Sequence, residues 1–219
     1  MLERLFRERR YRVNFHAHST YSDGSSSPRD ASPRIIPGVE VKVQEGGVDV
    51  LLYAEREKLI AFFHDVVEPA LDPFDPLYGA ARLKILELVG SAHEAGMWMV
   101  IPHYYHNEGL SVLLESLQRE VAKFPVAIEL NALLSRSANG AAKTFARAVH
   151  RPLIAAADSH RPDQYLAAYT SIPLPFCGSI SGQEGNALRQ VALACLPAGR
   201  LARQSEPVGL RSRSLAKRT

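Results

Sequence analysis

The feature that most constrains the fold is an alternation of apolar, β-rich runs with helical patterns along most of the chain. Strands are expected at residues 13–17, 38–43, 48–54, 97–103, 125–132 and 151–160. Helices are expected at residues 55–71, 80–96, 110–124, 138–150 and 187–196, with a short helix and an extended segment within residues 162–175. Alternation of this kind predicts an α/β fold with a mostly parallel sheet.

The chain has 219 residues, which is enough for one domain with a substantial core. We expect a basic lead-in at residues 1–12, the domain at 13–198, and a disordered basic tail at 199–219, where nucleic-acid contact is the alternative. No apolar run approaches the roughly 18 residues of a membrane span, and residues 1–12 lack a secretory pattern. Cys177 and Cys195 fit free thiols, so a cytoplasmic protein without a membrane partner is expected.

Residues that bind metals recur where the expected strands end. In α/β folds the carboxyl ends of strands hold the functional side chains. Five strand ends in this chain carry such residues, namely His16 and His18, Glu40, His103, Glu129, and Asp158 with His160. A single histidine is more often structural, but this recurrence predicts that the side chains converge on one site.

The residue types within these ends indicate the chemistry. His16 and His18 are two residues apart on a strand and therefore face the same way, and Asp158 and His160 repeat this spacing. Carboxylate and imidazole together suit Zn²⁺, Mn²⁺ or Fe²⁺ better than Mg²⁺. With no cysteine nearby, an open catalytic site is favoured over a closed structural one. Clustered ions of this kind activate water and bind phosphate.

The run FHAHSTYSDG and the later stretches PGVEV, IPH, IELNA and AADSH resemble, in this order, the PHP domain family (polymerase and histidinol phosphatase). The resemblance extends from about Val13 to Leu196 and is greatest to a branch of stand-alone metal-dependent phosphoesterases. It implies a distorted (β/α)7-like barrel that binds up to three divalent ions and hydrolyses phosphate esters through a metal-bound hydroxide.

The resemblance also implies a set of metal ligands, which are His16, His18, Asp23, Glu40, His103, Asp158 and His160. For Asp23, which precedes Gly24, a role in a turn is the alternative. Glu129 and Asn131 point the same way from their strand and are candidates for supporting the ligands from behind. Arg136 and Arg161 are candidates for binding a substrate phosphate, although either could be an ordinary surface arginine.

One part of the family pattern is missing from this chain. The second motif, usually Thr-Asp-His on its own strand after a helix, should lie before Glu40. Between Gly24 and Gly38 the chain has only SSSPRDASPRIIP, which contains three prolines and no histidine. A helix, a strand and their turns need roughly 25 residues or more. We therefore expect a barrel that is incomplete by about one βα unit and holds fewer ions, whether through natural variation, degeneration, an internal deletion or a faulty gene model.

The expected function is hydrolysis of a phosphomonoester or of a nucleotide or oligonucleotide phosphate ester. The expected partners are accordingly a small phosphorylated substrate or a short nucleic acid, and the oligomeric state stays open. A catalytically inactive PHP-like module is one alternative. An amidohydrolase-type hydrolase also begins with His-x-His, but Glu40 and the Asp158–His160 pair disfavour it.

Overall fold

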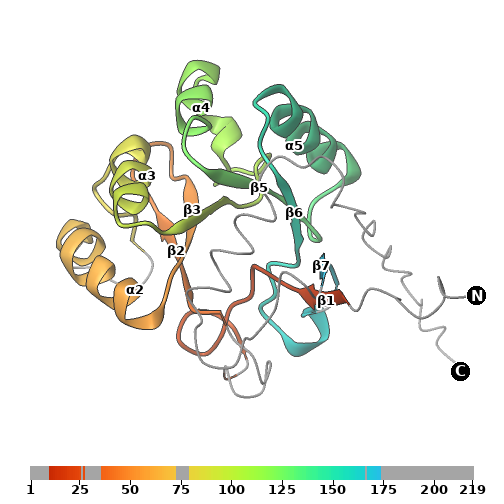
Figure 1. The fold of residues 1–219 in the computed structure, drawn as a ribbon, viewed down its shortest axis with the longest axis horizontal. Coiled ribbons are helices and arrows are strands. Elements are labelled where there is room, and N and C mark those ends of the chain that lie inside the picture. The colour runs from red at the N-terminus through yellow and green to blue at the C-terminus, as the bar shows by residue number, and fades with distance from the viewer. Residues whose placement is uncertain (1–9, 26, 28–35, 73–78, 166, 174–219) are drawn as a thin grey trace, which may run out of the picture.

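A computed structural model of the protein describes residues 10–25, 27, 36–72, 79–165 and 167–173. Its main sheet has five strands in the order β2-β3-β4-β5-β6, and a second sheet pairs β1 with β7 (Figure 1). The main strands are β2 Gly38–Lys42, β3 Asp49–Tyr53, β4 Trp98–Ile101, β5 Val126–Asn131 and β6 Leu153–Ala156. The small sheet consists of β1 Arg10–Val13 and β7 Thr170–Pro173.

The helices lie close to their expected positions. They are α2 Arg56–Phe62, α3 Ile85–Glu94, α4 Glu115–Val121 and α5 Arg136–Ala148. Helix α2 continues as a π-helical turn, Phe63–Val67, and a 3₁₀ turn, Glu68–Ala70, which contains Pro69. Further 3₁₀ turns lie at Leu110–Val112 and Pro162–Gln164. None of these described helices is long and apolar enough to cross a bilayer. The expected helix 187–196 and the tail 199–219 lie outside the described residues.

The prediction of a mostly parallel sheet is wrong for half of the strand pairs. Strands β4, β5 and β6 are parallel, whereas β3 is antiparallel to both β2 and β4. Residues 43–48 alone connect β2 to β3, and a parallel crossover needs about a dozen residues or more. Gly46 and Gly47 take positive φ angles there, which lets the chain reverse in a hairpin. The observed fold is therefore mixed α/β.

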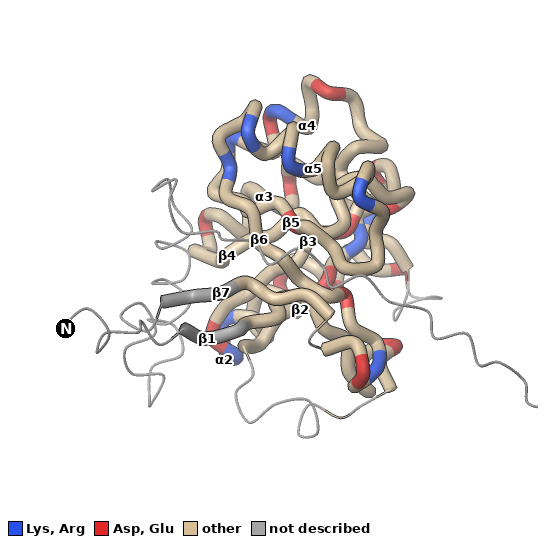
Figure 2. The backbone as a smooth tube through the Cα atoms, turned by 90° about the vertical axis from the view of Figure 1, so that its right-hand side faces the viewer, with Lys and Arg blue, Asp and Glu red and all other residues tan. Residues whose placement is uncertain are grey.

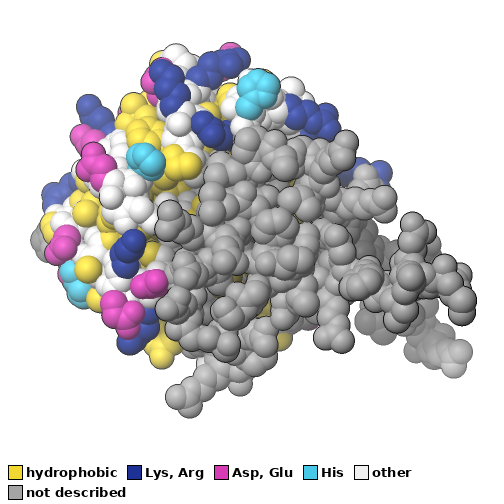
Figure 3. All heavy atoms as spheres, viewed as in Figure 1, with side chains coloured by type: hydrophobic (Ala, Val, Ile, Leu, Met, Phe, Trp, Pro, Cys, Tyr) yellow, Lys and Arg dark blue, Asp and Glu magenta, His cyan; other side chains and the backbone are white. Residues whose placement is uncertain are grey.

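The main sheet has a different environment on each face. Figure 2 shows α3, α4 and α5 on one side of β4, β5 and β6, with β1 and β7 on the other. On the helical side, strand residues such as Leu52, Met99 and Ile128 are buried with Leu88 of α3 in the main core. The opposite side carries a smaller cluster that includes Phe15, Tyr53 and Trp98. Charged side chains of both signs are interspersed over the described part of the surface in Figure 3.

The segment with the two histidines crosses this second side. The strand expected at 13–17 is observed instead at Arg10–Val13, and the chain then passes over the sheet. The Phe15 ring packs 4.9 Å from that of Trp98, and the Tyr53 hydroxyl donates a hydrogen bond to the Phe15 carbonyl oxygen. Further on, Ala17 forms a parallel bridge with Ser159, just past β6. Histidines 16 and 18 are thereby held beside the carboxyl end of β6.

The main sheet is open. Within the described residues, β2 pairs with β3 alone and no strand joins its other edge. The 13 residues between Gly24 and Gly38, where the family would place its second motif, are too few for a helix, a strand and their turns. An incomplete barrel agrees with this open edge, while the count of strands in a full barrel stays a prediction.

Candidate metal centre

Four side chains converge at the carboxyl ends of the strands, and we call them the inner group: His16, His18, Glu40 and Asp158. The Nε2 atoms of His16 and His18 lie 3.1 Å apart. Each of these nitrogens lies 3.3 Å from one oxygen of Glu40 and 3.3 Å from Asp158 Oδ1. Ligand atoms about 2.0–2.2 Å from a tetrahedral ion lie about 3.3–3.6 Å from one another. Three of these residues, His16, His18 and Glu40, offer ligand atoms that all lie within 4.8 Å of one another, and His18 and Asp158 do so together with His160. The inner group therefore contains one set of three residues with the spacing of metal ligands and shares two residues with another.

A second set, the hairpin group, shares Glu40 with the inner group and consists of Glu40, Asp49 and His103. His103 Nε2 lies 3.3 Å from Glu40 Oε1 and 3.7 Å from Asp49 Oδ2. Ligand atoms of all three residues lie within 4.8 Å of one another. Glu40 Oε1 thus faces both His16 and His103, and Oε2 faces His18, which suits a carboxylate shared between two ions.

Asp49 was not among the residues predicted from the sequence, because residues 48–54 were interpreted only as an apolar strand. A signal was present, since the aspartate interrupts that apolar run at its start. In the hairpin register Asp49 lies opposite Lys42, and Lys42 lies on the same face of β2 as Glu40. The pairing of β2 with β3, which the sequence did not predict, brings Asp49 to the site.

Asp23 and His160 form an outer pair at the solvent side of the cluster. Asp23 Oδ1 lies 2.9 Å from His18 Nδ1, and Asp23 Oδ2 lies 3.2 Å from His160 Nε2. The turn around Asp23 is closed by backbone bonds, in which Ser22 and Gly24 donate to the Ser19 carbonyl. The Asp23 carboxylate therefore faces the histidines. The structure brings the seven predicted ligands into one cluster, and their binding of metal stays a prediction.

Glu129, on β5, forms buried hydrogen bonds that support the inner group. Its fully buried carboxylate accepts hydrogen bonds from His16 Nδ1 at 3.0 Å, the His103 backbone N–H at 2.7 Å and Asn131 Nδ2 at 3.1 Å. Asn131 also donates to Asp158 Oδ2 at 3.2 Å. Partners of this kind fix the orientation of a ligating ring, here with Nε2 of His16 toward the cluster.

Helix α5 in turn fixes Asn131. The Asn139 side chain accepts a hydrogen bond from the Asn131 backbone N–H and donates one to the Asn131 carbonyl oxygen, both at 2.9 Å. Asn139 is buried in the first turns of α5 and was not among the predicted site residues. Its role depends on how α5 packs on β5, and no local sequence pattern predicts that contact.

Two of the predicted ligands have a strained backbone. His103 has a φ of 29° and Asp158 a φ of 50°, and residues with a Cβ rarely adopt such angles. Strain of this kind costs about 1–3 kcal/mol per residue and is concentrated at functional sites. The loop after His103 is also tight, because a Cβ at Gly109 would lie 2.3 Å from the His103 carbonyl oxygen. The fold thus holds both side chains in place at an energetic cost.

The residues of the inner group shift one another's pKa values. Burial lowers the pKa of His16, but the Glu129 and Glu40 carboxylates outweigh it and hold that pKa well above its usual range. Burial likewise opposes the shift at His18, whose bonds to Asp158 and Glu40 raise its pKa to about 9. Burial raises the pKa of Glu40, but its hydrogen bonds to His103, His16 and His18 bring it well below the usual range.

The pKa values of two further carboxyl groups, Asp158 and Asp49, are shifted in opposite directions. Burial works against ionisation of Asp158, yet the hydrogen bond from His18 and the charge of His16 lower its pKa to about 2. Burial and the charge of Glu40 raise the pKa of Asp49 to about 7. Without a divalent ion, protons on the histidines therefore balance the carboxylates. Imidazole must be neutral to bind a metal, so an ion entering the cluster displaces those protons.

The two arginines predicted as phosphate contacts lie outside these groups. Arg136 is exposed at the start of α5. Arg161 is exposed and directs its guanidinium to Asp163, with Nη2 2.9 Å from Oδ2. Neither has a described contact with a cluster residue, and their binding of phosphate stays a prediction.

Comparisons with known proteins support the fold. No family model matches the chain, and no curated protein matches it. Solved structures are similar. Endonuclease Q from Pyrococcus furiosus is 14% identical with a TM-score of 0.58, over 74% of this chain and 52% of that one. Endonuclease Q in complex with a 27-mer duplex that carries an abasic lesion is 14% identical with a TM-score of 0.56, over 74% and 53%.

A two-domain protein from Bacteroides vulgatus that contains a predicted PHP-like metal-dependent phosphoesterase is 12% identical with a TM-score of 0.53. The match covers 85% of this chain and 62% of that protein. This chain thus spans between half and two thirds of the length of these structures. The chain therefore has a PHP-like fold, as the resemblance of its motifs to the PHP family predicts.

Proposed function

We propose that this protein is a divalent-metal-dependent phosphoesterase. The observation that carries the proposal is the convergence of the inner group at the spacing of metal ligands, next to a hairpin group that shares Glu40. Divalent ions bound there would lower the pKa of a water and neutralise charge on a phosphate. Mn²⁺, Zn²⁺ and Fe²⁺ suit the mixture of imidazole and carboxylate.

The protein's own residues have separate tasks in this proposal. Glu40 holds the inner and hairpin groups together, because its Oε1 faces both His16 and His103 while its Oε2 faces His18. Glu129 and Asn131 hold the ligating rings and Asp158 in orientation. Since these contacts exist before substrate binds, little reorganisation is needed as charge develops on the phosphate.

A nucleotide or short oligonucleotide is the substrate class that we propose to test beside simple phosphomonoesters. Tyr21 is 89% exposed, three residues after His18, and Tyr105 is 58% exposed, two residues after His103. Exposed aromatic rings beside a site that binds phosphates offer surfaces for base stacking. One similar structure, endonuclease Q, is in complex with duplex DNA, which supports testing this class.

The test compares wild-type protein with His16→Ala in the presence of Mn²⁺ or Zn²⁺. Three substrates separate the classes: an aryl phosphomonoester, an aryl phosphodiester and a short single-stranded oligonucleotide. We expect turnover above the metal-only blank for at least one substrate, and its loss in His16→Ala. Absence of turnover with all three, together with well under one bound ion per chain by elemental analysis, would favour an inactive PHP-like module.

The amidohydrolase alternative has less support. Such enzymes end their ligand set with a lone aspartate, whereas His160 follows Asp158 here and contacts Asp23. Hydrolysis of amide substrates without any phosphoesterase turnover would reverse this preference.

A further inference from the structure

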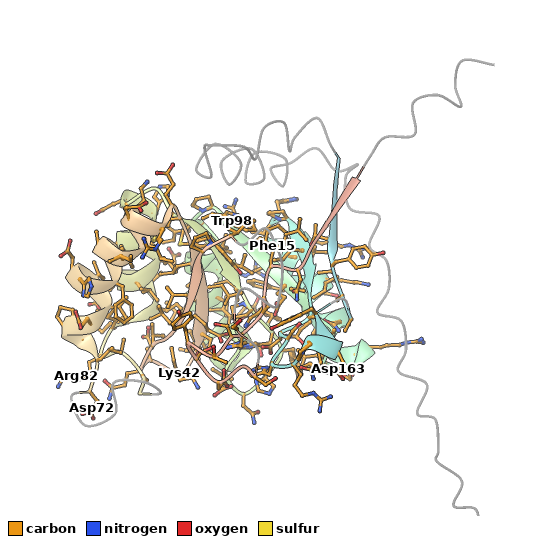
Figure 4. The ribbon with its side chains drawn as sticks, turned by 90° about the horizontal axis from the view of Figure 1, so that it is seen from below. Phe15, Lys42, Asp72, Arg82, Trp98 and Asp163 are labelled. Atoms are coloured by element: carbon orange, nitrogen blue, oxygen red, sulfur yellow. The ribbon has the colours of Figure 1, made fainter. Side chains whose placement is uncertain are left out.

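Lys42 stands at the rim of the cluster and has no place in the predicted site. Residues alternate along β2, so that Val39 and Val41 pack toward the helical core while Glu40 and Lys42 face the site. Lys42 lies one step beyond Glu40, toward the end of the strand, and pairs across the hairpin with Asp49. Figure 4 shows Phe15 and Trp98 toward one end of the domain and Lys42 toward the other.

The ammonium group of Lys42 is held near the cluster by a replaceable partner. Its Nζ forms an ion pair with Glu108, which follows His103 on the loop after β4. The backbone of this loop is fixed, because the Asp49 N–H donates to the Glu108 carbonyl oxygen at 2.9 Å. The side chains of Lys42 and Glu108 are both partly exposed, and exposed ion pairs contribute little to stability. The pair can therefore open at small cost.

The charge around Lys42 favours an anionic ligand once ions are present. Its ammonium group pairs with Glu108, while Asp49 lies opposite Lys42 across the hairpin and Glu40 lies on the same face of β2. Divalent ions bound by Glu40 and Asp49 would neutralise these two carboxylates, leaving Lys42 with Glu108. A phosphate group bound at the ions presents further negative oxygens on this side. A lysine suits that position, because its compact charge sits on a flexible stem with three donors.

We propose that Lys42 is a positioning residue that exchanges Glu108 for an oxygen of the substrate's phosphate group. This inference rests on the proposed phosphoesterase function. It assigns to Lys42, at the end of β2, the phosphate contact for which Arg136 and Arg161 were the sequence candidates.

The test measures binding of inorganic phosphate to Mn²⁺-loaded protein by calorimetry, together with KM and kcat for an aryl phosphate. Lys42→Met should weaken phosphate binding by about 10-fold or more and raise KM, at unchanged metal content, because a hydrogen bond to a charged group is lost. Lys42→Arg should retain most of the affinity. Lys123→Met is the matched control, because Lys123 forms an exposed ion pair with Glu120 away from the site.

Glu108→Gln provides an independent variant that leaves Lys42 in place. Freeing the ammonium group should strengthen phosphate binding a few-fold, and this gain should vanish in the Lys42→Met background, since coupled residues are non-additive. Phosphate affinity within twofold of wild type in Lys42→Met, at equal metal content, would overturn the inference. If Lys42→Met loses metal, Glu108→Gln decides the question. An unchanged phosphate affinity in Glu108→Gln would then overturn the inference.

Phosphate binding requires no turnover, which separates this inference from the proposed function. Wild-type protein that binds phosphate through Lys42 but hydrolyses no ester would contradict the function alone. Turnover that is unaffected by Lys42→Met would contradict the inference alone.

Discussion

The inner group and the outer pair belong to one cluster but differ in how the fold holds them. His16 of the inner group is 2% exposed and is anchored by Glu129, which the sheet buries completely. In the outer pair the Asp23 side chain is 49% exposed, and both residues lie on loops. Glu40 lies on β2, and hydrogen bonds with the buried Glu129 and Asn131 hold His16 and Asp158, whereas the outer pair rests on contacts between partly exposed side chains.

This difference coincides with the missing motif. The family would place its second motif, with another histidine, on a strand between Asp23 and Glu40, and this chain has only SSSPRDASPRIIP after Gly24. The candidate ligands of the inner and hairpin groups are all present, while no strand among the described residues carries Asp23 or His160. We therefore expect the affinity for metal ions to be graded, from a tight inner site to a weak outer one.

Glu40→Gln should have the largest effect, because Glu40 belongs to both the inner and the hairpin groups. Gln removes the charge and one oxygen of a carboxylate that the two groups share, so metal affinity and activity should fall by more than the ~100-fold upper range seen for residues that only support ligands. Elemental analysis and turnover of an aryl phosphate measure this. Glu115→Gln, an exposed glutamate on α4, is the control, and full metal content in Glu40→Gln would contradict the shared role.

Glu129→Gln should cost less, because Glu129 supports ligands without facing the ions. It orients the His16 ring and also binds the His103 backbone N–H. Loss of such a partner typically lowers metal affinity by about 10- to 100-fold. Competition with a chelator of known affinity measures the change. An unchanged affinity would mean that the His16 ring is held by packing alone.

A moderate effect is expected from pH. His18 has a folded pKa of about 9 against an ordinary value of 6.5, so its stabilising contribution is complete below pH 6.5 and is lost as the pH rises to about 9. The pKa values of His16 and His103 are also raised and act in the same direction. The melting temperature of metal-free protein should therefore fall between pH 6.5 and 9.

Metal-loaded protein should not show this fall, because ligating histidines are already neutral. Thermal melts in chelator and in Mn²⁺, at pH 6.5, 7.5 and 9, compare the two forms. Parallel curves would show that protons and ions do not compete for the same histidines.

Asp23→Asn should have the smallest effect of these changes. Its carboxylate contacts His18 and His160 at the solvent side, where exposed ion pairs contribute little. We expect an affinity loss of a few-fold that is confined to the weakest ion, measured by titration calorimetry against Asp163→Asn as the exposed control. A loss as large as that of Glu40→Gln would remove the distinction between the inner group and the outer pair.

The helices and strands were predictable where the local pattern is strong. Helices α2 to α5 and strands β2 to β6 lie within or near their expected ranges because apolar periodicity marks each of them. The first strand was displaced, since Asn14, His16 and His18 form hydrogen bonds with Ala157 and Ser159 beyond β6, which local sequence does not reveal. The direction of β3 was missed for a similar reason, because strand pairing is a long-range property.

The sequence alone indicated the class of site, since the candidate ligands His16, His18, Glu40, His103, Asp158 and His160 are recognisable by residue type and by their places at strand ends, and their binding of metal stays a prediction. Only the tertiary structure decided which of them share an ion-sized space. It also added Asp49, Asn139 and Lys42, through the hairpin register and the packing of α5 on β5. The physical reason is that residue type fixes what a side chain can bind, whereas convergence depends on contacts between segments far apart in the chain.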